Sequence, residues 1–114
     1  MKSWIHFLKN FKPINISDPA KKDLQKIAEY TQRKWGSLQK KYYFGLFKKS
    51  FKTLSHSVSN ESFVFLSKAR DEIVMGLFSY TVQKHVVYYR ESEQVFLIIR
   101  ILHSRMDPEK YLHE

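Results

Sequence analysis

The chain has 114 residues but no cysteine, only three glycines and only three prolines. The absence of cysteine excludes disulfides and thiolate zinc sites, and three scattered glycines form no glycine-rich phosphate loop. No apolar run approaches the roughly 20 residues that cross a bilayer. The length favours a single domain, and we expect a cytoplasmic protein with no membrane partner.

Acidic side chains are scarce in the first half of the chain. Residues 1–60 hold 13 Lys and Arg against three Asp and Glu, whereas residues 61–114 hold seven against eight. A basic half favours acidic partners, which include nucleic acid, anionic lipid and acidic protein segments. The alternative is a solvated, lysine-rich helix face, because charge alone does not name a partner.

Motifs for metal or cofactor chemistry are also missing. The five histidines are scattered, and none belongs to an HExxH motif or stands beside paired carboxylates. No serine lies in a GxSxG-like turn. We therefore expect no metal site and no cofactor.

The most informative stretch that is present runs from Val95 to Asp107. Its first eight residues are apolar except for Arg100, which is typical of a strand buried on both faces. The exit of this strand adds two further ionisable side chains, those of His103 and Arg105, before Asp107. We therefore place this strand at the centre of a sheet.

Two helices are predicted between residues 18 and 54. Asp18 as N-cap, with Pro19 at the first helical position, marks the start of the first helix. Gly36 marks the corner between the two helices, and so short a corner predicts an antiparallel hairpin. Trp35, at this corner, is predicted to be a packing residue whose change to Ala costs about 3–5 kcal/mol.

The remaining pattern predicts strands around this hairpin. A short strand at residues 14–16 precedes it, a polar loop at 55–63 follows it, and strands are expected at 73–82, 85–90 and 95–103. Asp107-Pro108 predicts a short C-terminal helical turn. The predicted class is α+β: an N-terminal short strand, then a helix hairpin packed on a three-stranded antiparallel sheet. Residues 1–12 are interpreted as an N-terminal extension to one domain at 13–114.

Symmetric closure of both strand turns divides this sheet into two faces, with His85 opposite Arg100 and Tyr89 opposite Phe96. The face expected under the helix hairpin is aliphatic and comprises Leu77, Val86, Val95, Leu97, Ile99 and Ile101. The other face is aromatic with two cations and comprises Phe78, Tyr80, His85, Tyr89, Phe96, Ile98 and Arg100. No helix obviously covers the aromatic face, so we expect a partner surface there unless one chain end covers it.

RNA cleavage by general acid–base catalysis is one reaction that the residue types permit. The candidate acids and bases are His85, His103 and Tyr111, and the candidate phosphate ligands are Arg70, Arg100 and Arg105. However, Arg100 and His103 differ by three positions and so lie on opposite faces of a strand. Structural roles, with His103 hydrogen-bonded at the strand exit and Arg105 paired with Asp107, are the preferred interpretation.

Three blocks of the sequence carry a family resemblance. The first is the order Ala20, Asp23-Leu24, Ile27, Tyr30-Thr31, Trp35-Gly36, Gln39, Tyr42 or Tyr43, and Leu46. The second runs from Arg70-Asp71-Glu72-Ile73 to Tyr88-Tyr89-Arg90, and the third is Arg100-Ile101-Leu102-His103-Ser104-Arg105-Met106-Asp107. Together they resemble the ParE-type toxins of bacterial toxin–antitoxin modules, over about residues 14–112.

The resemblance implies a RelE/ParE-like fold and a toxin that inhibits DNA gyrase by binding. It also implies a ParD-like antitoxin that lays a helix and an extended segment over the toxin in a hetero-oligomer. The related RelE branch cuts messenger RNA on the ribosome, so a ribonuclease is the alternative. A non-toxic module that retains antitoxin binding is a second alternative.

Two sets of contact residues follow as hypotheses. The expected gyrase contacts are Arg70, Arg100, His103, Arg105 and Asp107. The expected antitoxin contacts lie on the aromatic face and are Phe78, Tyr80, His85 and Tyr89.

Overall fold

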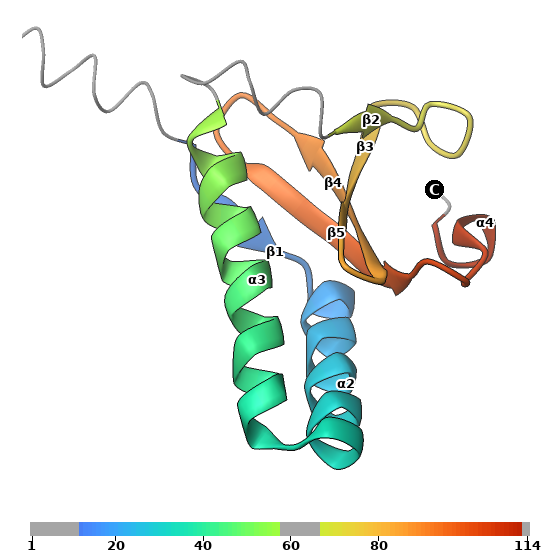
Figure 1. The fold of residues 1–114 in the computed structure, drawn as a ribbon. Helices are drawn as coiled ribbons and strands as arrows, with labels where there is room; N and C mark the ends of the chain where they lie inside the picture. The colour runs from blue at the N-terminus through green and yellow to red at the C-terminus, as the bar shows by residue number, and fades with distance from the viewer. Residues whose placement is uncertain (1–11, 58–66, 113–114) are drawn as a thin grey trace, which may run out of the picture.

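The computed structural model describes residues 12–57 and 67–112 (Figure 1). The expected extension at residues 1–12 lies outside the described residues except for Lys12, as does most of the expected loop at 55–63. Within the described part of the chain, neither long helix has the apolar length that a membrane crossing requires.

The described elements are two long helices, one five-stranded sheet and a short C-terminal helix. In chain order they are β1 (Ile14–Ile16), α2 (Asp18–Trp35), α3 (Ser37–Ser55), β2 (Lys68–Ala69), β3 (Leu77–Val82), β4 (His85–Glu91), β5 (Phe96–His103) and α4 (Pro108–Tyr111). The strand order is β1-β5-β4-β3-β2. The expected antiparallel strands form its centre, while β1 adds in parallel to β5 and β2 adds to β3.

The ends of α2 explain how the chain enters and leaves the hairpin. Ser17, rather than the expected Asp18, caps the helix: its hydroxyl accepts from the Ala20 N–H at 3.2 Å and donates to the Ile99 carbonyl at 2.8 Å. At the other end, Gly36 has a φ of 93°, a left-handed conformation that favours glycine. The predicted antiparallel helix hairpin is thereby confirmed.

The helix hairpin covers the aromatic face of the sheet, not the aliphatic one. Phe47 and Leu54 of α3 pack against a buried cluster that includes Tyr80, Tyr89 and Phe96. The prediction that the aliphatic face lies under the helix hairpin is therefore wrong, although most residues are divided between the two faces as expected. Large aromatic side chains remove the most apolar area from water when the helices cover them, which favours the observed arrangement.

The second hairpin does not have the predicted register, because His85 lies opposite His103 and not Arg100, and β5 also contains a β-bulge. The first hairpin pairs as predicted, with Tyr80 opposite Val87, but in the second Tyr88 faces Arg100 while Tyr89 faces Ile98. The extra residue, Ile99, shifts the alternation, so Ile101 turns into the main core and Arg100 lies opposite Tyr88, outside that core. A regular strand would have placed the Arg100 charge in the main core, which is costly.

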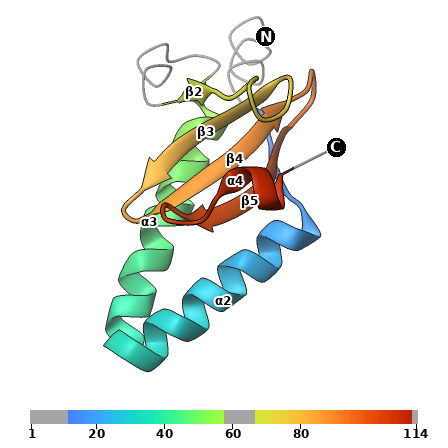
Figure 2. The same cartoon turned by 90° about the vertical axis from the view of Figure 1, so that its right-hand side faces the viewer.

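The opposite face of the sheet has a second, smaller core. It consists of Leu77, Tyr88, Leu102 and Leu112, the last of which follows α4. Figure 2 shows α4 lying in front of β4 and β5, with α3 behind the sheet. The C-terminal segment therefore covers the aliphatic face, and not the aromatic face that a chain end was considered able to cover.

Stability measurements separate the observed core from the expected one. Trp35 is 64% exposed, so its predicted role as a packing residue is wrong, whereas Phe47 is 1% exposed. We expect Phe47→Ala to lower the free energy of unfolding by about 3–5 kcal/mol, because it opens a cavity, and Trp35→Ala to lower it by less than about 1 kcal/mol. Urea denaturation of both variants measures the difference, and equal losses would contradict this core.

Candidate functional site

Asp23 of α2 and Arg100 of β5 form an ion pair with two hydrogen bonds between the side chains. The Arg100 Nε and Nη2 atoms donate to the two Asp23 carboxylate oxygens at 2.8 and 2.9 Å, and the Ile101 N–H donates to the same carboxylate at 2.9 Å. The hydrogen bond to Asp23 raises the pKa of Arg100, although burial opposes the shift. Arg100, an expected gyrase contact, thus serves to hold α2 against β5.

Two other expected gyrase contacts are also engaged within the fold. Arg70 donates from Nε to the Ser79 hydroxyl at 3.0 Å and lies 3.6 Å from the Glu72 carboxylate. Asp107 accepts from the Glu109 N–H at 3.1 Å and caps α4. The structure describes no ion pair between Asp107 and Arg105, so the expected pairing of those two side chains is wrong.

His103 and Arg105 remain close together at the exit of β5. The Arg105 N–H donates to His103 Nδ1 at 3.1 Å, which confirms the expected hydrogen bond of His103 at this exit. The Arg105 side chain is exposed. The five expected gyrase contacts therefore do not form one cluster, and of these five only His103 and Arg105 lie together at the strand exit.

The four expected antitoxin contacts lie under or beside the helix hairpin. Tyr80 and Tyr89 are 5% and 6% exposed, and Phe78 stacks on Tyr89 with ring centroids 5.8 Å apart. The Tyr80 hydroxyl is hydrogen-bonded to Ser50, and burial raises the pKa of Tyr80. The expectation that these side chains form an exposed surface is wrong. The half-buried His85 lies at the edge of this layer.

His85 forms a small polar cluster with Tyr43 and His103. Its Nδ1 atom shares a hydrogen bond with the Tyr43 hydroxyl, and its ring lies edge-on to that of His103 with centroids 5.3 Å apart. Burial lowers the pKa of His85 to about 4, the neighbouring His103 lowers it too, and Asp23 opposes the shift. Because burial also raises the pKa of Tyr43, both partners of the hydrogen bond are neutral near pH 7.

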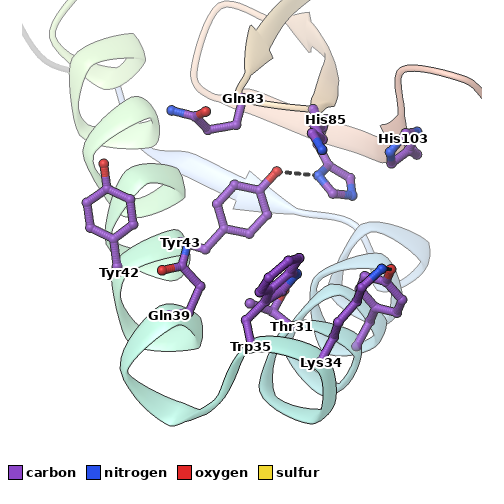
Figure 3. A pocket seen from close by; sticks show the side chains of 11 residues that line it. Thr31, Lys34, Trp35, Gln39, Tyr42, Tyr43, Gln83, His85 and His103 are labelled. Atoms are coloured by element: carbon purple, nitrogen blue, oxygen red, sulfur yellow. Dashed lines mark hydrogen bonds between the residues drawn. The ribbon is translucent and has the colours of Figure 1, made fainter.

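This cluster forms one wall of a pocket of about 580 Å³ at the tip of the helix hairpin, which we call the tip pocket. Its lining residues are Tyr30, Thr31, Lys34, Trp35, Gln39, Tyr42, Tyr43, Gln83, Lys84, His85 and His103. Figure 3 shows the Trp35 ring directed into the space below His85, with Tyr43 beside it. A pocket of this size is large enough for a small organic ligand or part of a larger one.

The exposed aromatic rim of the tip pocket was not predicted from the sequence. Tyr30, Trp35 and Tyr42 are 51%, 64% and 59% exposed, although Trp35 was expected to be a packing residue. The available signal was position: all three lie within about two helical turns of Gly36, where a hairpin can extend past the sheet. Figures 1 and 2 both show this corner projecting beyond the strands.

The described residues contain no group of three or more His, Cys, Asp or Glu side chains that could hold a metal ion. The chemistry of the tip pocket is instead that of aromatic rings, lysines, imidazoles and amides.

The fold and the sequence together identify the family. Residues 14–108 match the family model described as the ParE toxin of the type II toxin–antitoxin system parDE. The chain therefore belongs to the ParE toxin family. It is thus a ParE-type toxin of a type II toxin–antitoxin system.

Solved structures agree on the fold. The chain is similar to one from the "Chromosomal ParDE TA system from P. aeruginosa", at 18% identity and a TM-score of 0.65, covering 82% of this chain and 97% of that one. It is also similar to a chain of the E. coli DinJ-YafQ toxin–antitoxin complex, at 12% identity and a TM-score of 0.55, covering 81% and 91%. The expected RelE/ParE-like fold is confirmed. No curated protein matches the chain.

Removing one partner of the Asp23–Arg100 pair should be strongly destabilising. The two side chains are 12% and 22% exposed, so Asp23→Ala leaves a largely enclosed guanidinium and the Ile101 N–H without their acceptor. We expect a loss of about 2–4 kcal/mol in urea denaturation. Lys21→Ala, which breaks an exposed pair with Asp18, is the control and should cost less than about 0.5 kcal/mol. A loss that small for Asp23→Ala would contradict the assignment.

The lowered pKa of His85 should make the free energy of unfolding depend on pH. Its pKa is about 4 in the fold against 6.5 for the free side chain, so the unfolded chain binds more protons between these values. Stability is then fully present above pH 6.5 and falls as the pH drops toward 4, by on the order of 1 kcal/mol after solvent screening. His85→Gln should lose less stability over this range. Parallel curves for the variant and the unchanged protein would exclude this origin.

Proposed function

We propose that this ParE-type toxin inhibits DNA gyrase by binding it, and that a ParD-like antitoxin neutralises the toxin. The observation that carries the proposal is the match of residues 14–108 to the ParE family model. The solved ParDE structure supports an antitoxin partner, because its description names a toxin–antitoxin system. Gyrase inhibition and a cytoplasmic site of action follow from the family resemblance.

The geometry favours inhibition by binding over bond cleavage. A phosphodiester-cleaving site needs an acid, a base and free cations around one phosphate. Of the arginines that the sequence suggested as phosphate ligands, Arg100 is held by Asp23, and Arg70 contacts Ser79 and Glu72. His85, with a pKa of about 4, is a weak base whose Nδ1 is already hydrogen-bonded.

We place the gyrase contact at the exit of β5. Arg105 is exposed there, and the backbone Ser104 N–H donates to the Lys84 carbonyl at 2.8 Å, which brings a second cation alongside. His103, which lines the tip pocket, lies beside these two cations. Such exposed cations steer association with an acidic partner surface.

We place an extended segment of the antitoxin along β3. β2 pairs only with Phe78 and Ser79, so no described strand lies beside Thr81 on that edge. The Leu77 carbonyl accepts from the Arg70 N–H on the same edge, and by alternation the backbone groups of Thr81 point the same way. The adjoining groove of about 440 Å³ contains Lys49. An acidic extended segment can therefore add a strand there.

A supercoiling assay with purified gyrase tests the toxin's target. We expect inhibition by the unchanged protein and a loss of about three- to tenfold in potency for Arg105→Gln, because a steering cation is removed. Lys52→Gln, an exposed cation in the last turn of α3, is the matched control and should keep full potency. Undisturbed supercoiling at micromolar excess of toxin would refute the gyrase proposal.

The same protein in a translation extract tests the ribonuclease alternative. The observation that favours this alternative is the contact between the His85 and His103 rings in one pocket. Cleavage of messenger RNA that is abolished by His85→Ala or His103→Ala would establish it, and intact messages would dismiss it. Normal growth on induced expression, with antitoxin binding retained, would instead indicate a non-toxic binding module.

The antitoxin edge is tested with the product of a short acidic reading frame beside the toxin gene. Thr81→Pro removes a backbone donor that points away from β4, and edge strands tolerate proline. We expect affinity to fall by about tenfold or more in calorimetry, while Thr81→Val, which keeps the donor, should bind normally. Equal affinities for both variants would rule out strand addition at this edge.

A further inference from the structure

The tip pocket combines exposed aromatic rings with cations and no carboxylate. Its rim presents Tyr30, Trp35 and Tyr42 to solvent, each more than half exposed. None of the eleven lining residues is an Asp or Glu, whereas Lys34 and Lys84 are among them. A surface of this composition favours a ligand that is both flat and negatively charged.

Lys34 holds its charge directly beside the rings. Its Nζ atom lies 5.5 Å from the centroid of the Trp35 ring and 5.6 Å from that of Tyr30, and it donates to the Tyr30 hydroxyl at 3.1 Å. An anionic group bound to this ammonium would therefore lie next to an exposed π face. Nucleotides meet this condition, because each joins a phosphate to a flat base.

Amide side chains supply a second kind of recognition. Gln39 of α3 and Gln83 of the β3–β4 turn both line the tip pocket, and each offers a donor and an acceptor. Figure 3 shows them on the same side of the pocket as Tyr42, with Trp35 across from them. A base stacked on an aromatic ring there could form hydrogen bonds through its edge.

We propose that the tip pocket binds an unpaired nucleic acid strand, with a base stacked on Trp35 and the neighbouring phosphates held by Lys34 and Lys84. The strand must be unpaired, because the rings line a pocket that only a splayed base can enter. The basic half of the chain adds long-range attraction for such a strand. An acidic polypeptide shares the charge, but it has no flat base to stack on these rings or to pair with the amides.

Fluorescence reports stacking directly. The chain has two tryptophans, so Trp4→Phe leaves Trp35 as the single tryptophan. We expect a thymidine oligonucleotide of about 12 nucleotides to quench Trp35 emission on binding, because stacking brings base and indole into contact. Binding without any change in Trp35 emission would overturn the proposal.

Anisotropy of a labelled oligonucleotide gives the affinities. Trp35→Ala should weaken binding by about tenfold, which is within the range for losing one stacked base. Leu38→Ala is the matched control, because Leu38 is 86% exposed at the same tip but does not line the pocket. We expect its affinity to change by less than about twofold. Equal effects of the two variants would overturn the stacking role.

Salt dependence and competition distinguish the remaining ligands. Replacing Lys34 and Lys84 by Gln should reduce the slope of log affinity against log salt by about 1.4, the value for two lost phosphate contacts on a single strand.

Thymidine and uridine oligonucleotides identify DNA or RNA as the preferred strand, and binding of either supports the proposal. Duplex DNA or polyglutamate that competes as well as the single strand would overturn it. Because gyrase and antitoxin are absent from these assays, the result is independent of the proposed function.

Discussion

The contact between Asp23 and the edge of β5 is the constraint on which the rest of the structure depends. β1 pairs with β5 only as far as Ile98, and the chain then leaves the sheet at Ser17 to begin α2. The Ile101 N–H is left without a strand partner on that side, and the Asp23 carboxylate accepts from it as well as from Arg100. The Asp23 carboxylate thus accepts the hydrogen bond of the unpaired Ile101 N–H and neutralises the charge of Arg100. Both contacts fix the position of α2 against β5. The bulge at Ile99 is part of the same arrangement, because it turns Arg100 away from the main core.

This attachment acts near the start of α2, so the helix hairpin is held at one end and projects at the other. The main core lies between the sheet and the side chains nearest the attachment, including Ala20, Phe47 and Leu54. The far end of the hairpin projects past the strands, so Tyr30, Trp35 and Tyr42 remain exposed to water there. Exposed aromatic side chains at such a position are more typical of a binding surface than of a core.

Much of the fold could be predicted from local signals. The helix ends were predictable from Asp107-Pro108 and Gly36, and the register of the first hairpin from the two-residue turn at Gln83-Lys84. Each of these signals acts over only a few residues. The assignment of the faces failed for a non-local reason. Alternation correctly separated Tyr80 and Tyr89 from Leu77, but which of the two faces the helices cover depends on packing between distant elements. The extra residue in β5 reverses only the positions beyond it, such as Ile101, and no glycine or proline marks that position. The tip pocket could not be predicted either, since the exposure of Trp35 depends on how far the hairpin extends past the sheet.

The sheet also has a smaller core on the face opposite the helix hairpin, with fewer buried residues than the main core. Four buried residues form the smaller core, and the last of them, Leu112, follows a helix of a single turn. Detachment of this segment would uncover Leu102 and Tyr88 while the larger core stayed closed, which is the pattern of a local opening below the global unfolding transition. The Tyr111 ring lies over the Arg100 guanidinium, 5.5 Å from its centre, so the same opening would let water reach the charge that Asp23 holds. In the structure the Tyr111 ring shields part of the Arg100 guanidinium from water, which strengthens its interaction with Asp23.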